Sequence, residues 1–188
     1  MKFDMAAFGS DGVLAGSVRG QQAFLALLKD TANSQAPTVV FLDFGAVHVA
    51  TGSFLRESVI AYRNHVRSHF SRLYPVVANA NEAVVEELSM LLQLRNDALA
   101  ICKHSRAGRV SDAKVIGVVD GKQQEALQAV LSRGEADAPT LARTTPDQKP
   151  TVWNNRLTAL VHKGLLIEDA TAKTNRYRPV LEGLTYGT

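Results

Sequence analysis

The sequence predicts an α/β domain followed by a smaller, mainly helical domain that ends in a β-hairpin. Over residues 1–107, short apolar runs alternate with helical patterns, which is typical of strands and helices packed in one α/β layer. Residues 120–188 show three helical patterns and then two short strand patterns. The stretch between them, 108–119, follows a polar segment with a glycine and is expected to be a linker. The 188 residues are therefore expected to form two domains.

In the first domain, residues 38–44 predict a strand that is covered on both faces. The run Thr38-Val-Val-Phe-Leu-Asp-Phe44 is almost entirely apolar or β-branched, as in a parallel sheet. Apolar residues recur on one stripe over 54–73 and predict a long helix. The other expected elements are opening strands at 3–8 and 13–17, a helix at 20–32, strands at 74–78 and 98–102, and a helix at 83–92. Together they predict a small sheet flanked by helices.

In the second domain, glycine and proline delimit the expected helices. Gly134 ends a first helix over 123–132, and Gly164 ends a third helix that has Pro150 near its first turn. A short second helix is expected at 139–143, and two strands at 165–167 and 176–181. The buried stripe of the third helix is expected to consist of Val152, Leu157, Leu160 and Val161.

Composition excludes several classes of protein. The net charge is only +3 with neutral His, so the chain is not a polycation that coats nucleic acid nonspecifically. The one cysteine, Cys102, excludes an intramolecular disulfide framework and a Cys-rich zinc site, and we expect it to be a core residue in a reduced, cytoplasmic setting. No apolar run approaches the ~18–20 residues that span a bilayer, and we expect neither a membrane partner nor a signal peptide.

Few side chains suggest catalysis or metal binding. The sequence lacks a Gly-rich phosphate loop with Lys, a Gly-x-Ser-x-Gly motif and a paired-carboxylate pattern, so we expect neither an enzyme nor a cofactor. His65 and His69 have a spacing that can bind one metal ion, but no Asp, Glu or Cys lies nearby to complete a set, so no metal site is expected. For Asp43 we expect a structural role in turning the chain. The alternative is an enzyme that uses Asp43, His48 and Thr51.

One stretch of the first domain has a family likeness. The run Val39-Val-Phe-Leu-Asp-Phe-Gly45 followed by Thr51-Gly-Ser-Phe-Leu-Arg-Glu57 resembles the STAS-like domains of bacterial regulatory proteins. The resemblance implies a small sheet flanked by helices and a role in protein–protein interaction, because related anti-sigma-factor antagonists bind a partner kinase through this loop and helix start. It also places Thr51 and Ser53 where those antagonists can be phosphorylated, although the run here is Ala-Thr-Gly-Ser rather than Asp-Ser-Ser/Thr-Gly.

The residues themselves suggest another role for these hydroxyl groups. A hydroxyl just before a helix commonly accepts a hydrogen bond from a free backbone N–H of the first turn, which stabilises the helix by ~1 kcal/mol. Phosphate at the same place would gain from the helix dipole. Capping and a regulatory phosphosite at Thr51 or Ser53 therefore remain alternatives.

The second domain also has a family likeness. Its order of helix, short helix, longer helix and hairpin, with the run Arg156-Leu-x-x-Leu-x-x-Lys-Gly-Leu-Leu-Ile167 and the later Asn175-Arg-Tyr-Arg-Pro-Val180, resembles the winged helix-turn-helix domains of bacterial transcription regulators. The resemblance implies that the third helix enters the major groove of duplex DNA and that the hairpin, or wing, meets the flanking phosphates.

Local charge agrees with that implication. Residues 149–178 contain six bases and two acids, net +4, whereas residues 120–148 contain three bases and five acids, net −2. The polar residues near the start of the third helix could read base edges, since Asn can bond adenine and Thr can touch the thymine methyl group. Trp153 is expected to pack in the core rather than touch a base. The expected DNA-contacting residues are Thr151, Asn154, Asn155 and Thr158 for bases, Arg156, Lys173 and Arg176 mostly for phosphates, and in addition Lys149 and Arg178.

The sequence thus predicts a bacterial DNA-binding transcriptional regulator in which a STAS-like sensor or interaction domain controls a winged helix. Its expected partners are double-stranded DNA, a protein or kinase at the first domain, and a second copy of the chain, with the helix at 54–73 as one dimer interface. The alternative is an adaptor that binds protein rather than DNA and that phosphorylation controls.

Overall fold

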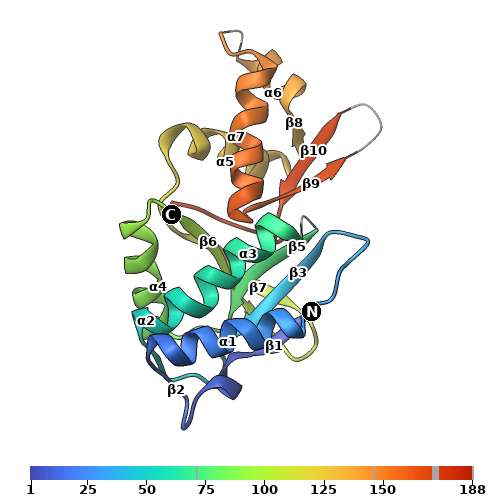
Figure 1. Ribbon diagram of the computed structural model, residues 1–188. Helices are drawn as coiled ribbons and strands as arrows, with labels where there is room; N and C mark the ends of the chain where they lie inside the picture. Colours follow the sequence, from blue (N-terminus) through green and yellow to red (C-terminus); the bar gives the residue numbers. More distant parts are fainter. Residues whose placement is uncertain (71, 146, 171–173, 188) are drawn as a thin grey trace.

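The computed structural model describes residues 1–70, 72–145, 147–170 and 174–187, and it has an α/β fold built on a mixed five-stranded sheet (Figure 1). The strand order is β1-β3-β5-β6-β7, in which neighbouring strands are parallel except for β7, which is antiparallel to β6. The strands are β1 (Lys2–Asp4), β3 (Thr38–Asp43), β5 (Leu73–Ala78), β6 (Ala98–His104) and β7 (Val110–Gly117).

Helices cover one face of this sheet. They are α1 (Ser17–Lys29), α2 (Gly52–Leu55), the π-helical turn η2 (Arg56–Ile60), α3 (Ala61–His69) and α4 (Glu82–Leu94). Successive residues of a strand face opposite sides, so Leu42, Val77 and Leu99 pack with these helices in one hydrophobic cluster. A 3-10 turn η1 (Met5–Phe8) and a two-stranded parallel sheet of β2 (Val13–Leu14) and β4 (Val49–Ala50) lie beside them.

The expected linker at 108–119 is instead largely strand β7. Its register with β6 runs from Ala98↔Gly117 to His104↔Val110, with an irregularity between Ile101 and Lys103. Over 112–115 buried and exposed residues alternate, with Ala113 and Val115 buried and the polar residues between and before them exposed. An edge strand with polar outward residues resembles a linker in sequence, and this is why the pattern predicted one.

Two further boundaries differ from expectation. The long helix expected over 54–73 begins at Gly52 and ends at His69, and Leu73 already belongs to β5. Proline at 75 and the extended run around it place those residues in the sheet. The expected opening strand at 3–8 is a strand only as far as Asp4, because the Asp4 side chain accepts a hydrogen bond from the Ala6 N–H and caps η1.

The C-terminal module, defined as α5 to β10, follows in the upper part of Figure 1. Its elements are α5 (Gly121–Arg133), β8 (Ala136–Asp137), α6 (Ala138–Thr144), α7 (Pro150–Lys163), β9 (Leu166–Ala170) and β10 (Asn175–Pro179). The strands form an antiparallel sheet in the order β8-β10-β9. Gly164 ends α7 in the left-handed conformation at φ 80°, as expected for a helix C-cap.

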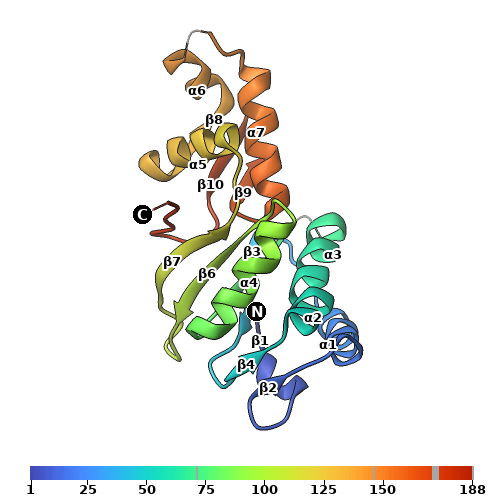
Figure 2. The same cartoon turned by 90° about the vertical axis from the view of Figure 1, so that its left-hand side faces the viewer.

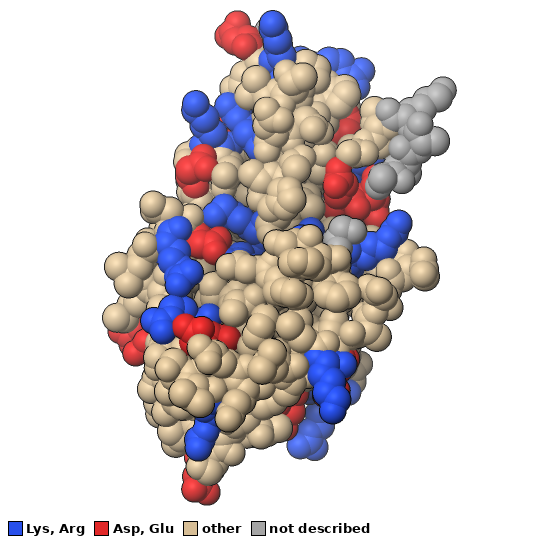
Figure 3. All heavy atoms as spheres, in the orientation of Figure 1, with Lys and Arg blue, Asp and Glu red and all other residues tan. Residues whose placement is uncertain are grey.

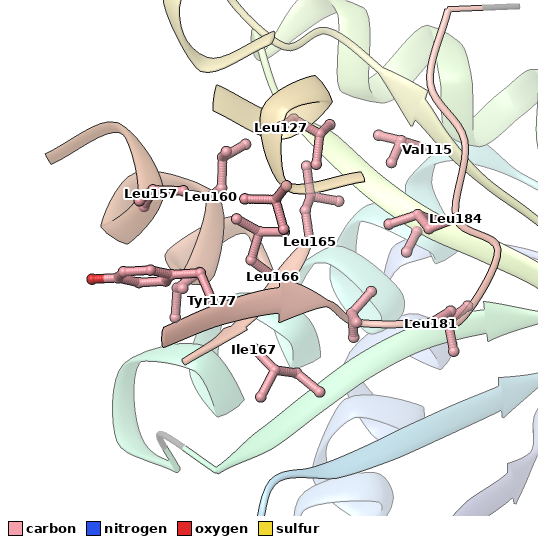
Figure 4. Packing of buried hydrophobic residues seen from close by; sticks show 14 of the residues in the cluster. Val115, Leu127, Leu157, Leu160, Leu165, Leu166, Ile167, Tyr177, Leu181 and Leu184 are labelled. Atoms are coloured by element: carbon pink, nitrogen blue, oxygen red, sulfur yellow. The ribbon is translucent and has the colours of Figure 1, made fainter. Parts of the chain in front are cut away.

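The second face of the large sheet belongs to the same hydrophobic cluster as the C-terminal module. Figure 4 shows Val115 of β7 near Leu127 of α5, and Leu184 near both. The segment after β10 returns along β7, where the Val115 N–H donates to the Thr185 carbonyl at 2.8 Å and the Thr185 N–H donates to the Ala113 carbonyl at 3.0 Å. The α/β part and the module therefore share one core. Figure 2 shows β6 and β7 reaching up to the module.

Within the described ranges, no helix is both long enough and apolar enough to cross a membrane.

Candidate functional site

Helix α7 is the centre of the candidate site. Its buried side consists of Trp153, Leu157, Leu160 and Val161. Val152, which the sequence placed in this stripe, is 39% exposed, and Trp153 takes its place at 2%. The spacing of four residues from Trp153 to Leu157 follows the helix period, whereas Val152 lies about 100° away around the axis. The Trp153 indole N–H donates to Thr145 Oγ1 at 2.9 Å, so this side chain packs, as expected.

The four polar residues of α7 that were expected to read bases differ in exposure and in hydrogen bonding. Thr151 and Asn155 are exposed, and neither side chain makes a hydrogen bond within the described part of the chain. Asn154 is also exposed, but its Oδ1 accepts a hydrogen bond from the Tyr177 hydroxyl of β10 at 2.9 Å. Thr158 is half-buried. The four residues expected to face DNA therefore do not share one environment.

One expected phosphate contact, Arg156, and one further base of α7, Lys163, bond acids of the same chain. The Arg156 side chain is 12% exposed, bonds Glu125 Oε2 at 2.9 Å and Gln148 Oε1 at 2.7 Å, and lies over the Trp153 ring. Lys163, which contributed to the expected positive charge, bonds Asp97 Oδ1 at 3.2 Å. Both side chains connect α7 to other elements.

The remaining cations of the site are exposed. Arg176 pairs with Glu135 at 2.9 Å and Arg178 with Asp169 at 3.0 Å, and all four side chains are at least 41% exposed. Lys149 is exposed and makes no ion pair among the described residues, while Lys173 lies outside the described residues.

Three of the acids that compensate these bases lie outside the window 149–178. Glu125, Glu135 and Asp97 come from α5, the turn after α5 and the segment after α4. The net charge of +4 counted over residues 149–178 therefore becomes smaller when the acids that lie close to these bases in the fold are included. In Figure 3 the surface over α7 is mostly tan, and blue groups beside it alternate with red ones.

The C-terminal end of α7 rests on two buried arginines of α3 that sequence reasoning missed. Arg63, 2% exposed, donates to the carbonyl oxygens of Lys163 at 3.0 Å and Ala98 at 3.1 Å, and it forms an ion pair with Asp97. Arg67, 7% exposed, donates from Nε to the Val161 carbonyl at 3.2 Å. The last carbonyls of a helix lack partners inside the helix and carry partial negative charge, so guanidinium groups stabilise them.

Burial and charge act in opposite directions on Asp97. Burial alone would raise the pKa of its carboxyl group, but Arg63, the Ala98 N–H and Lys163 together hold that pKa below its ordinary value. The sequence signal for this cluster was available, since Arg63 and Arg67 stand four residues apart beside Tyr62 and Val66 on the apolar stripe.

The helices α2, η2 and α3 follow one another without a break, and Thr51 lies at their N-terminal end. Thr51 is the N-cap of α2, which confirms the capping prediction. Its Oγ1 accepts hydrogen bonds from the Phe54 N–H at 3.4 Å and from the Gly16 N–H at 3.2 Å, and lies 3.1 Å from Ser53 Oγ. A Cβ built on Gly52 would lie 3.0 Å from Glu87 Oε2, so a carboxylate faces this helix start. That negative charge disfavours a phosphate group here.

The other candidate residues have structural surroundings. Asp43 accepts from the Gly45 N–H at 3.0 Å and the Asn79 amide at 2.8 Å, and pairs with Lys2 at 2.6 Å, consistent with the expected role in turning the chain. Cys102 is buried in the core, as expected. The His65 and His69 rings stack at 4.2 Å. Among the described residues, no group of three His, Cys, Asp or Glu side chains could hold a metal ion.

No protein-family model matches this chain. A comparison with curated proteins likewise finds no match.

Proposed function

We propose that this chain is a bacterial transcriptional regulator that binds duplex DNA with α7 and the β9–β10 hairpin. The observation that carries the proposal is the order α5, β8, α6, α7, β9, β10 together with the sheet order β8-β10-β9. In a winged helix-turn-helix domain the helix at the place of α7 enters the major groove and the hairpin meets the backbone beside it. The α/β part is proposed to be the STAS-like partner-binding domain.

The exposed groups of this surface suit DNA. Thr151 and Asn155 offer a methyl group, a hydroxyl and an amide from the first two turns of α7. Lys149 precedes the helix, and Arg176 and Arg178 lie on β10. Exposed ion pairs contribute only ~0–1 kcal/mol, so either arginine can exchange its carboxylate for a phosphate at little cost.

The test is fluorescence anisotropy of labelled random and genomic duplexes with the full chain at several salt concentrations. Affinity should fall steeply between roughly 50 and 200 mM salt because phosphate contacts release counterions. Arg176→Ala should weaken binding to all sequences, and Arg19→Ala, an exposed site on α1, is the matched control and should change nothing. Absence of salt-dependent binding in every duplex would overturn the proposal.

A second function is favoured by the ion pairs. Of the five described bases in residues 149–178, four already have an acidic partner within the chain. A surface compensated in this way suits a protein partner better than a polyanion, so an adaptor that binds protein is the alternative. A pull-down with the immobilised chain tests this adaptor function. It would be favoured if Asn155→Arg abolished capture of a protein partner and if the wild type bound no duplex.

A further inference from the structure

We propose that Tyr177 divides the recognition of DNA between two neighbouring asparagines, leaving Asn155 to read an adenine and leaving Asn154 with only one end of its amide free. The inference rests on the proposed function and names the part of that surface that carries sequence preference.

The starting point is the hydroxyl of Tyr177. The side chain is fully buried on β10, and Figure 4 shows its ring beside Leu157 with the hydroxyl pointing away from the hydrophobic cluster. The hydroxyl oxygen lies 2.9 Å from Asn154 Oδ1 and 3.2 Å from Glu168 Oε1 of β9, and its single proton is shared between these two acceptors. Burial, more than any other cause, raises the pKa of the Tyr177 hydroxyl above its ordinary value, so the hydroxyl keeps its proton at neutral pH. One group thus connects α7 to both strands of the hairpin.

This bond limits what Asn154 can recognise. An asparagine reads adenine with two hydrogen bonds, one from its amide N–H₂ to N7 and one from the adenine N6 amino group to its oxygen. Both amide atoms must then face the base edge together. Asn154 Oδ1 instead faces the hydroxyl of a buried tyrosine, so only the other end of the amide is left facing outward. One free end cannot make the paired contact with adenine and suits a single hydrogen bond, for example with the DNA backbone.

Asn155 has no such restriction. Its side chain is exposed and has no hydrogen-bond partner within the described residues, so both ends of the amide are available. Thr151 lies four positions earlier, one turn away on the same face of α7. An amide that bonds adenine and a methyl group that touches thymine then stand side by side, and this edge of the helix should prefer adjacent A·T pairs.

The test is selection of bound sequences from a randomised duplex library with the full chain, followed by anisotropy on the best site. Asn155→Ala should abolish the preference for adenine at one position and weaken the best site by about 5- to 150-fold. Asn154→Ala should weaken all sequences by one common factor and leave the preferences unchanged. Tyr177→Phe, which keeps the ring volume, should alter the preference at a different position and leave the adenine that depends on Asn155; circular dichroism checks its fold.

The outcomes separate this inference from the proposed function. If the wild type binds no duplex, both fail. If it binds with a sequence preference that Asn155→Ala leaves intact, or that Asn154→Ala removes, only the division between the two asparagines is overturned.

Discussion

The guanidinium of Arg63 donates to the backbone carbonyl of Lys163, 100 positions further along the chain. Arg67 does the same for Val161, so α3 of the α/β part caps the last turn of α7. A helix end is normally capped by residues close to it in sequence. Here Gly164 supplies such a local cap, and the two arginines of α3 add donors from the other half of the chain. These added bonds fix the orientation of α7 relative to the α/β part.

Arg63→Ala should therefore destabilise the whole chain. The substitution leaves Asp97 without its main partner and two carbonyls without a donor, and removal of one member of a buried ion pair typically costs roughly 3–5 kcal/mol. Urea unfolding followed by circular dichroism measures the loss. Arg56→Ala removes an exposed pair with Glu57 and should cost less than about 1 kcal/mol. Equal effects of the two substitutions would contradict this role for Arg63.

The same cluster predicts a dependence of stability on acid. Because the pKa of Asp97 is lowered in the folded chain, its ionised form stabilises the fold above the ordinary value of 3.8, and this stabilisation is lost as the pH falls through the lower, folded value. Urea unfolding at pH 7, 5, 4 and 3 should show a steeper loss for the wild type than for Asp97→Asn. Parallel curves for the two proteins would mean that other carboxyl groups, such as Asp43, account for the loss.

Unfolding should be a single transition. Trp153 is the one tryptophan and reports on the C-terminal module, while circular dichroism reports on the whole chain. A shared core couples the two parts, so the fluorescence and circular dichroism curves in urea should coincide. Two separated midpoints would show that the module unfolds independently.

Thr51→Ala should cost ~1 kcal/mol of unfolding free energy, because it removes the N-cap of α2. Thr51→Ser keeps the hydroxyl and is the matched control, with a smaller change expected. Mass spectrometry of the protein from its native cell asks the separate question of modification. Phosphate found there on Thr51 would show that the capping bonds open.

Cys102 should react slowly with thiol reagents. Burial raises the pKa of its thiol from 9.0 to about 11, which leaves about 100-fold less thiolate at pH 8. Reaction with a chromogenic disulfide should be slow in buffer and fast in concentrated urea. Fast reaction of the folded chain would show that β6 opens readily.

Local patterns predicted the elements that depend on neighbouring residues. The apolar run that became β3, the helical periods of α5 and α7 and the glycine after α7 all carry their signal within a few positions. β7 gave no such signal, since its outward residues are polar and only pairing with β6 makes it a strand. The STAS-like and winged helix-turn-helix interpretations remain predictions.

The candidate surface was harder to predict because it depends on distant partners. Arg156 bonds Glu125, 31 positions earlier, and Lys163 bonds Asp97, 66 positions earlier, so a charge count over 149–178 could not include those acids. Asn154 and Asn155 are identical in type and adjacent in sequence. Only the position of Tyr177 on β10 distinguishes them.

The pairing of Thr185 with β7 has a consequence for how molecules of this protein meet. The outermost strand of a sheet exposes backbone groups that a strand of another chain can pair with. On β7, the Ala113 carbonyl and the Val115 N–H are already taken by Thr185. Pairing of β7 with a strand of a second molecule is therefore hindered. We expect such pairing between molecules at the opposite edge of the sheet, along the short strand β1.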